Sequence, residues 1–193
     1  NPVFEYDLVK VPSGDIYVLA KELVEAVMKA ARIDSWEVLG TLLGSDLELM
    51  HTKHPIMDRE SLVICGNHVT LDAGTGCVHT APGFGADDFI VCQKYDIPII
   101  VPVDGKGMTT ADAGKYANLY YEKSTPVILE DLKSCGALLA IEEIVHSYPH
   151  CWRCKNPIIF RTTEQWFCSV DALKDDAVKA CEADQMDSGL GRR

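Results

Sequence analysis

The sequence predicts a mainly β protein with added helices, in which short strands form a closed, barrel-like core and helices decorate it. Three observations support this α+β class. Short apolar runs bounded by glycine, proline and aspartate are numerous, and long segments of helical periodicity are few. From residue 146 the sequence becomes aromatic, basic and cysteine-bearing. We therefore expect one domain over residues 1–145 and a small cysteine-bearing segment over residues 146–193.

Turn residues and the period of the apolar positions place the individual elements. Residues 7–11 and 16–20 are two predicted strands around a Pro-Ser-Gly-Asp turn. Residues 20–33 form a predicted helix, because apolar side chains recur on one helical face. These side chains are Leu23, Val24, Val27, Met28 and Ala31. Further strands are expected within residues 35–56, 61–81, 97–105 and 137–149, and further helices at 86–95, 124–136 and 171–186.

The helix expected at residues 124–136 carries its own boundary signals. Ser124 or Thr125 would cap its start, Pro126 would fit its first turn, and Gly136 would end it.

Composition and charge exclude several classes of protein. The 193 residues are 47% hydrophobic and 24% charged, which is typical of a globular chain and not of a disordered one. The net charge of −11 argues against a broad surface that neutralises nucleic-acid phosphates, although it allows a small pocket for one nucleotide end. No apolar run reaches the roughly 18 residues of a membrane span, and no signal peptide is evident. Because the chain lacks an initiator methionine, we expect it to be a piece of a longer protein.

The stretch GTGCVHTAPGFGADD, residues 74–88, concentrates four glycines, one histidine and two aspartates. A strand that ends in Gly-Thr-Gly can turn sharply and let a ligand or another backbone approach closely. Asp87 and Asp88 fall in the first turn of the helix that follows. There they either stabilise the helix end, or one of them binds a cation such as an ammonium group. His79 is either a structural histidine or a pocket residue.

Two of the eight cysteines, Cys151 and Cys154, form a CxxC motif. Such a turn can hold one side of a tetrahedral zinc, which needs four ligands, and His146 and His150 do not complete the usual spacing. Ordinary buried cysteines are the alternative, since most of the other thiols lie in apolar runs. Because the cysteines do not form the dense, loop-borne framework of a secreted protein, we expect a reduced, cytoplasmic protein. Residues 161–167, RTTEQWF, could contact RNA or pack between domains.

Two long compound motifs resemble the isoleucyl-tRNA synthetase family. They are HVTLDAGTGCVHTAPGFGADD with the QKY that follows, and HSYPHCWRCKNPIIFRTTEQWF. The resemblance is densest over residues 66–95 and 146–168, and points to the editing domain inserted into the catalytic domain of this class I aminoacyl-tRNA synthetase, plus its return segment. Valyl and leucyl enzymes share the GTG turn and the downstream aspartate, but lack a histidine at the place of His79.

The resemblance implies a proofreading hydrolase that acts on valine esterified to the 3′ end of tRNA(Ile), or on valyl adenylate. Water would cleave the ester without a covalent enzyme intermediate or a catalytic metal. Asp88 would bind the α-ammonium group and His79 would line the amino-acid pocket, as the catalytic core. Gly74, Thr75 and Gly76 would pass close to the adenosine, and Asp87 would belong to the helix end. The implied partners are tRNA(Ile), its valine and the rest of the synthetase, with no membrane.

The sequence departs from the family pattern in several places. A threonine-rich strand that positions substrate and water belongs just upstream of residue 1, and the adenylation signatures HIGH and KMSKS are absent, so activity of this chain alone is in question. Cys151 and Cys154 match one of two CxxC pairs that hold zinc in some members. We therefore expect no complete metal site and no cofactor here, while the full enzyme uses ATP and, in some members, zinc. A tRNA-binding spacer without editing activity and a zinc-organised interaction module are the alternatives.

Overall fold

The computed structural model describes residues 1–183, which fall into two compact units, residues 1–162 and a second unit that begins at Thr163. This division by contacts falls after Thr162, whereas the sequence places a functional boundary at residue 145. That functional boundary stays a prediction.

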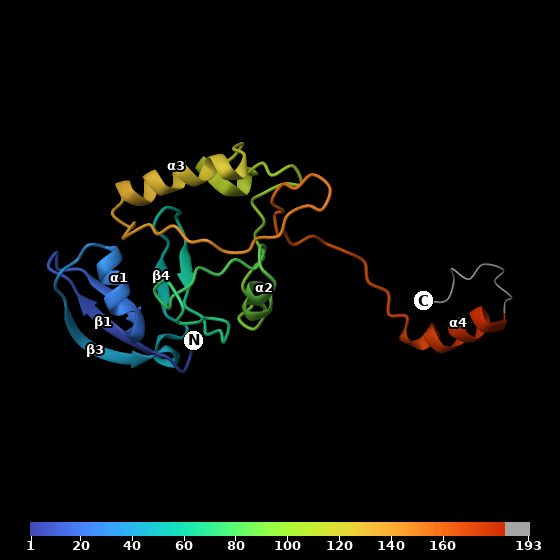
Figure 1. Ribbon diagram of the computed structural model, residues 1–193, viewed down its shortest axis with the longest axis horizontal. Helices are drawn as coiled ribbons and strands as arrows, with labels where there is room; N and C mark the ends of the chain where they lie inside the picture. The colour runs from blue at the N-terminus through green and yellow to red at the C-terminus, as the bar shows by residue number, and fades with distance from the viewer. Residues whose placement is uncertain (184–193) are drawn as a thin grey trace. The chain divides into compact units, whose positions relative to one another are not determined.

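A three-stranded antiparallel sheet, in the order β2-β1-β3, opens the first unit (Figure 1). Its strands are β1 (Glu5–Lys10), β2 (Ile16–Ala20) and β3 (Glu37–Leu43). Tyr6 pairs with Ala20 on one side and with Leu42 on the other. The strand pair predicted around the Pro-Ser-Gly-Asp turn is confirmed, and Gly14 supplies the positive φ of +94° that this turn uses.

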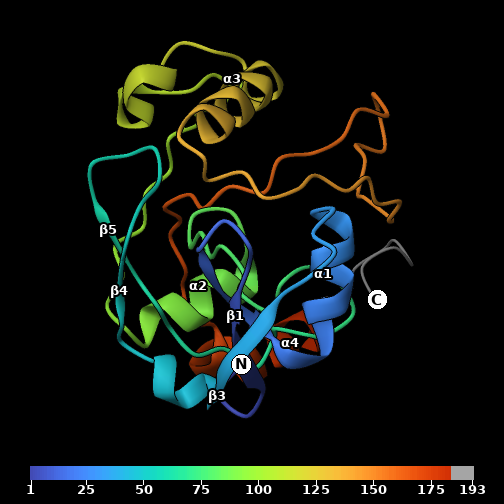
Figure 2. The same ribbon diagram turned by 90° about the vertical axis from the view of Figure 1, so that its left-hand side faces the viewer.

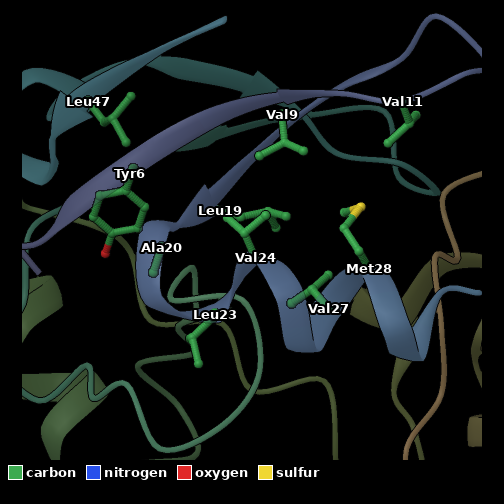
Figure 3. Packing of buried hydrophobic residues seen from close by; sticks show 10 residues of the cluster. All are labelled: Tyr6, Val9, Val11, Leu19, Ala20, Leu23, Val24, Val27, Met28 and Leu47. Atoms are coloured by element: carbon green, nitrogen blue, oxygen red, sulfur yellow. The ribbon is translucent and has the colours of Figure 1, made fainter. Parts of the chain in front are cut away.

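The helical segment after β2 covers one face of this sheet. It begins as a 3-10 turn, η1 (Lys21–Leu23), and continues as α1 (Val24–Ala30). The predicted apolar face is buried here, except that Ala31 is only partly buried. Figure 3 shows Val24 and Met28 of α1 facing side chains of β1 and β2. The core consists of Tyr6, Val9, Val11, Leu19, Ala20, Leu23, Val24, Val27, Met28 and Leu47. Burial of each large apolar side chain contributes about 1.5–3 kcal/mol, so this cluster fixes the sheet and helix as one body.

A separate two-stranded hairpin follows the 3-10 turn η2 (Gly44–Leu47). Its strands are β4 (His51–Lys53) and β5 (Glu60–Leu62), with Thr52 opposite Ser61. Figure 2 shows the hairpin rising from η2 toward α3. At its tip the terminal methyl group of Met57 lies 3.5 Å from the place where a side chain on Gly114 would begin.

The remaining elements of the first unit are helical. They are α2 (Ala86–Gln93), the 3-10 helix η3 (Ala111–Tyr116) and α3 (Tyr121–Ser134). The prediction of a helix after the glycine-rich stretch is confirmed, although α2 ends two residues earlier than expected. The 3-10 helix is tied to α3, because the Tyr116 hydroxyl donates a 2.6 Å hydrogen bond to the Asp131 carboxylate.

The start of α3 differs from the expectation. The helix begins at Tyr121 with Tyr120 as its N-cap, so neither Ser124 nor Thr125 caps it and Pro126 lies beyond the first turn. The Ser124 hydroxyl donates to the Tyr121 carbonyl at 2.6 Å, inside the helix. Gly136 ends the helix as predicted, with a φ of +73°.

No closed barrel forms within residues 1–183, so the barrel-like core is unconfirmed, while the mixed helix and strand class is observed. Beyond β5, the segments expected as strands within residues 61–81, 97–105 and 137–149 pair at most through isolated bridges such as Val103 with Thr109. Their apolar runs favour extended backbone, but the described residues offer no adjacent strand with which they pair. A strand needs such a partner for its backbone hydrogen bonds.

The second unit contains α4 (Asp171–Ala183), which confirms the helix predicted for this segment. No residue of α4 is buried within the described chain. The end of the predicted helix, up to Met186, lies outside the described residues.

Candidate functional site

The Gly-Thr-Gly turn is held against the end of β2 by hydrogen bonds. The Ala20 amide donates to the Thr75 carbonyl at 2.8 Å. The Tyr6 hydroxyl donates to the Gly76 carbonyl at 2.9 Å in a buried position. Burial, with the nearby thiols of Cys77 and Cys65 adding to it, raises the pKa of Tyr6 to about 12, so this phenol stays a donor at neutral pH.

The two glycines of the turn have the same backbone conformation for different reasons. Gly74 and Gly76 both have φ +77°. A Cβ on Gly76 would lie 2.4 Å from the Ala20 Cβ, whereas one on Gly74 would meet nothing within 4 Å. The close approach at Gly76 is therefore made to the protein's own core, while Gly74 has open space beside it.

A cavity of about 450 Å³ lies between the β4–β5 hairpin and the segment that carries the turn. Its wall includes Tyr6, Thr52, Arg59, Ser61, Gly76 and His79. The structure thus brings Gly76 and His79, but not Gly74, Thr75 or Asp88, to this wall. His79 is itself solvent-exposed, so it is accessible to a ligand that enters the cavity.

Asp88 links the start of α2 to the segment that carries His79. Its Oδ2 atom accepts a hydrogen bond of 3.1 Å from the Ala81 amide, and the side chain is half-buried. A side chain on Gly85 would begin 3.0 Å from that oxygen, so the Asp88 carboxylate would have to shift slightly to admit it. Asp87, one position earlier, is exposed. This geometry makes Asp88 a structural tie, and its Oδ1 atom makes no hydrogen bond to the described residues.

Charged and polar groups gather beside His79 at the tip of the hairpin. The Nδ1 atom of His54 accepts hydrogen bonds from the Ile56 and Met57 amides, at 3.3 and 3.1 Å. Burial lowers the pKa of His54, and the nearby side chains of Arg59 and His79 add to this effect. His54 is therefore neutral at pH 7, and Arg59 carries the fixed charge at this end of the cavity.

Sequence reasoning missed several residues of this wall. Tyr6 precedes the strand predicted at residues 7–11, Arg59 lies between two predicted segments, and no motif marks either residue. His68 also lines the cavity, and its Nε2 atom is buried without a hydrogen-bond partner among the described residues. Only the alternation of side chains along the hairpin strands could have indicated Arg59.

The CxxC motif forms a tight turn. The Cys151 amide donates to the Asn156 carbonyl at 2.8 Å, and the Lys155 amide donates back to the Cys151 carbonyl at 2.9 Å. Amide groups of Cys154 and Arg153 lower the pKa of the Cys151 thiol, which favours a thiolate. No cluster of three or more metal-ligating side chains occurs in residues 1–183. Two thiols fit half of a four-ligand zinc site and do not complete one.

Within the part of the chain that the structure describes, none of the helices combines the length and apolar character needed to traverse a bilayer.

Comparison with known proteins connects this architecture to the tRNA synthetases. The sequence model of the family described as "Leucyl-tRNA synthetase, editing domain" matches residues 20–146. Isoleucine–tRNA ligases from Caldicellulosiruptor saccharolyticus, a Thermoanaerobacter species and Bacillus cereus are 55%, 52% and 51% identical to the chain. These alignments cover 94%, 93% and 93% of the chain, but only 20%, 19% and 19% of the ligases. The chain thus spans about one fifth of the length of these relatives.

A solved structure of low sequence identity has a similar fold. The crystal structure described as GlLeuRS-CP1 superposes with a TM-score of 0.53 at 15% identity, covering 77% of this chain and 76% of the other. The sequence-based resemblance to isoleucyl-tRNA synthetases is confirmed by the ligases above. Because the family model matches more than half of the sequence, the chain belongs to the tRNA synthetase editing-domain family.

Proposed function

We propose that this chain is the proofreading part of an isoleucine–tRNA ligase and hydrolyses valine esterified to the 3′ end of tRNA(Ile), or valyl adenylate. The observation that carries the proposal is the cavity of about 450 Å³ with His79 on its wall, in a chain of the editing-domain family. Water attacks the carbonyl carbon of the tRNA ester, the bond to the ribose oxygen breaks, and valine and tRNA leave. In valyl adenylate the bond to the phosphate oxygen breaks instead, and valine and AMP leave.

Such a second pocket meets a known limit of binding. An aminoacylation site binds isoleucine only about 1–3 kcal/mol more favourably than valine, because the two differ by one methylene group. The isoleucyl enzyme is the standard illustration of this limit. A smaller pocket that hydrolyses only the smaller amino acid removes the remaining errors. In our proposal His79 narrows that pocket so that valine enters and isoleucine does not.

Asp88 contributes the charge for the amino-acid end of the substrate. Its Oδ2 atom is engaged by the Ala81 amide, so the α-ammonium group binds at Oδ1. Gly74 and Thr75 face the adenosine, and the open space beside Gly74 allows a nucleoside to approach the backbone. The editing step itself uses no cofactor. ATP is used by the whole ligase in the cytoplasm, and in some ligases Cys151 and Cys154 would supply half of a zinc site.

The test compares Asp88 with its neighbour in a full-length isoleucine–tRNA ligase carrying this segment. Asp88→Asn should slow deacylation of Val-tRNA(Ile) by at least about tenfold, since a charged hydrogen bond contributes about 1.5–3 kcal/mol. Asp87→Asn removes the same charge from the same helix turn and should leave deacylation unchanged, because this side chain is exposed. Isoleucine activation should be unaffected in both. Equal effects of the two substitutions would refute the ammonium role.

A second experiment separates editing from mere tRNA binding. The chain and a version extended upstream are assayed side by side for deacylation of Val-tRNA(Ile). Hydrolysis by the extended form alone means that the pocket needs residues upstream of Asn1. Absence of hydrolysis in the full-length ligase, with tRNA binding retained, would favour the non-catalytic spacer instead.

A further inference from the structure

Arg59 places a fixed positive charge on the wall of the cavity. It is the only lysine or arginine among the described residues that line this cavity. The whole chain carries a net charge of −11, so a cation here is not the result of a generally basic surface. No carboxylate of residues 1–183 lies within salt-bridge distance of its guanidinium group.

The pairing of the hairpin directs Arg59 toward the cavity. Thr52 lies opposite Ser61. Two positions nearer the tip, His54 lies opposite Arg59, and its amide donates a 3.0 Å hydrogen bond to the Arg59 carbonyl. Successive side chains of a strand point to opposite faces, so Thr52, Ser61 and Arg59 share one face. All three line the cavity, as does Leu62 at the base of the hairpin.

The opposite face of the hairpin is chemically different. Lys53 lies opposite Glu60, and the His51 Nδ1 atom is 2.9 Å from a Glu60 carboxylate oxygen. None of these three residues lines the cavity. One face of the hairpin therefore carries Glu60 with His51 and Lys53 beside it. The other face carries Arg59, which has no carboxylate partner among the described residues.

The backbone around Arg59 is fixed, which limits where its side chain can reach. Its amide donates to the Met57 carbonyl at 2.9 Å, and the same tip orients His54 through two amide hydrogen bonds. Arg59 and His79 both line the cavity, so the guanidinium group shares this wall with His79.

We propose that Arg59 binds the 5′-phosphate of the adenosine that carries the amino acid. This assignment rests on the proposed function and names a further substrate-binding residue of the same site. A planar guanidinium group with several donors matches phosphate oxygens in a bidentate arrangement. The terminal nucleotide of tRNA and the aminoacyl adenylate both contain this phosphate. In the adenylate valine is attached to the phosphate and in tRNA to the ribose, so the two substrates are assayed separately.

The test uses substrates with and without this phosphate, in a full-length isoleucine–tRNA ligase carrying the segment. Arg59→Gln should lower kcat/KM for Val-tRNA(Ile) by about tenfold or more. The same variant should hydrolyse 3′-valyl-adenosine, which has a free 5′-hydroxyl, as fast as the unmodified enzyme does. Arg59→Lys keeps the charge without the bidentate geometry and should lose less activity than Arg59→Gln.

Lys53→Gln is the matched control, because it removes the same charge from the other face of the same hairpin. It should leave both substrates unaffected. Consumption of ATP in the presence of valine measures hydrolysis of valyl adenylate. If Arg59→Gln slows only that reaction, Arg59 binds the phosphate of the adenylate. If it slows only deacylation of Val-tRNA(Ile), Arg59 binds the phosphate of the terminal nucleotide of tRNA.

Two results would overturn the assignment. One is an equal loss on 3′-valyl-adenosine, which would mean that Arg59 supports the pocket without binding phosphate. The other is an undiminished rate of Arg59→Gln on both phosphorylated substrates. Neither result is confused with failure of the proposed function, since that failure shows as absence of hydrolysis by the unmodified enzyme.

Discussion

Replacement of Gly76 by alanine tests how the glycine turn is held against the core. The new Cβ would lie 2.4 Å from the Ala20 Cβ and 3.3 Å from a ring carbon of Tyr6. Two carbon atoms in contact prefer about 3.5–4.0 Å, so the turn or the strand end has to move by roughly 1 Å or more. That movement strains the hydrogen bond from the Tyr6 hydroxyl to the Gly76 carbonyl.

Gly74→Ala provides the matched comparison, because both glycines have φ +77°. The left-handed conformation costs an alanine about 1–2 kcal/mol at either position. Only Gly76→Ala adds overpacking, which costs about 1–3 kcal/mol more. We therefore expect Gly74→Ala to lower the free energy of unfolding by about 1–2 kcal/mol and Gly76→Ala by about 2–5 kcal/mol.

Urea denaturation of the chain, followed by far-ultraviolet circular dichroism, measures both free energies of unfolding. Equal m-values for the variants would show that the comparison concerns the folded state. A Gly74→Ala variant that is destabilised as much as Gly76→Ala would refute the argument, because the contact with Ala20 would then contribute nothing.

Three further substitutions or modifications probe other contacts. Tyr6→Phe leaves a buried carbonyl without its donor and should lower the free energy of unfolding by about 1–3 kcal/mol, measured in the same urea titration. The hydrogen bond from Tyr116 lowers the pKa of Asp131 in the folded protein. The ionised carboxylate therefore stabilises the fold above its unfolded pKa, and this stability is lost as the pH falls through its folded pKa. Asp131→Asn should flatten the decline of the free energy of unfolding in acid, and an unchanged decline would contradict the pairing. Because the pKa of the Cys151 thiol is lowered, iodoacetamide should alkylate Cys151 faster than the exposed Cys168 near pH 7. Peptide mass mapping after short exposures measures both rates. Faster alkylation of Cys168 would mean that the amides of Cys154 and Arg153 have no effect on the Cys151 thiol.

Local patterns in the sequence predicted the elements that depend on local interactions. The apolar face that includes Val24 and Met28 forms a buried helix as expected, because helical periodicity alone specifies which side chains meet the sheet. Gly136 ends α3 as expected, because a positive φ is a local property of the chain. The predicted start of α3 was wrong. Tyr120 is the N-cap and makes no side-chain hydrogen bond there, so no sequence signal marks this end of the helix.

The barrel and the full wall of the site depend on contacts that a sequence pattern does not contain. An apolar run such as residues 97–105 is compatible with a strand, but it forms one only where another strand presents free hydrogen-bonding groups. The motif identified His79 and Gly76, which do line the cavity. Tyr6 and Arg59 reach the same wall from positions far from the motif, through the register of β1 and of the hairpin.

The hydrogen bond between Tyr6 and Gly76 joins residues 70 positions apart, and this separation has a kinetic consequence. A contact that closes so long a loop carries a large entropic cost, and it forms after the local hairpins and helices. The elements β1, β2 and α1 are close together in the sequence, so we expect them to form before the glycine turn docks onto them. An intact cavity wall depends on this late contact.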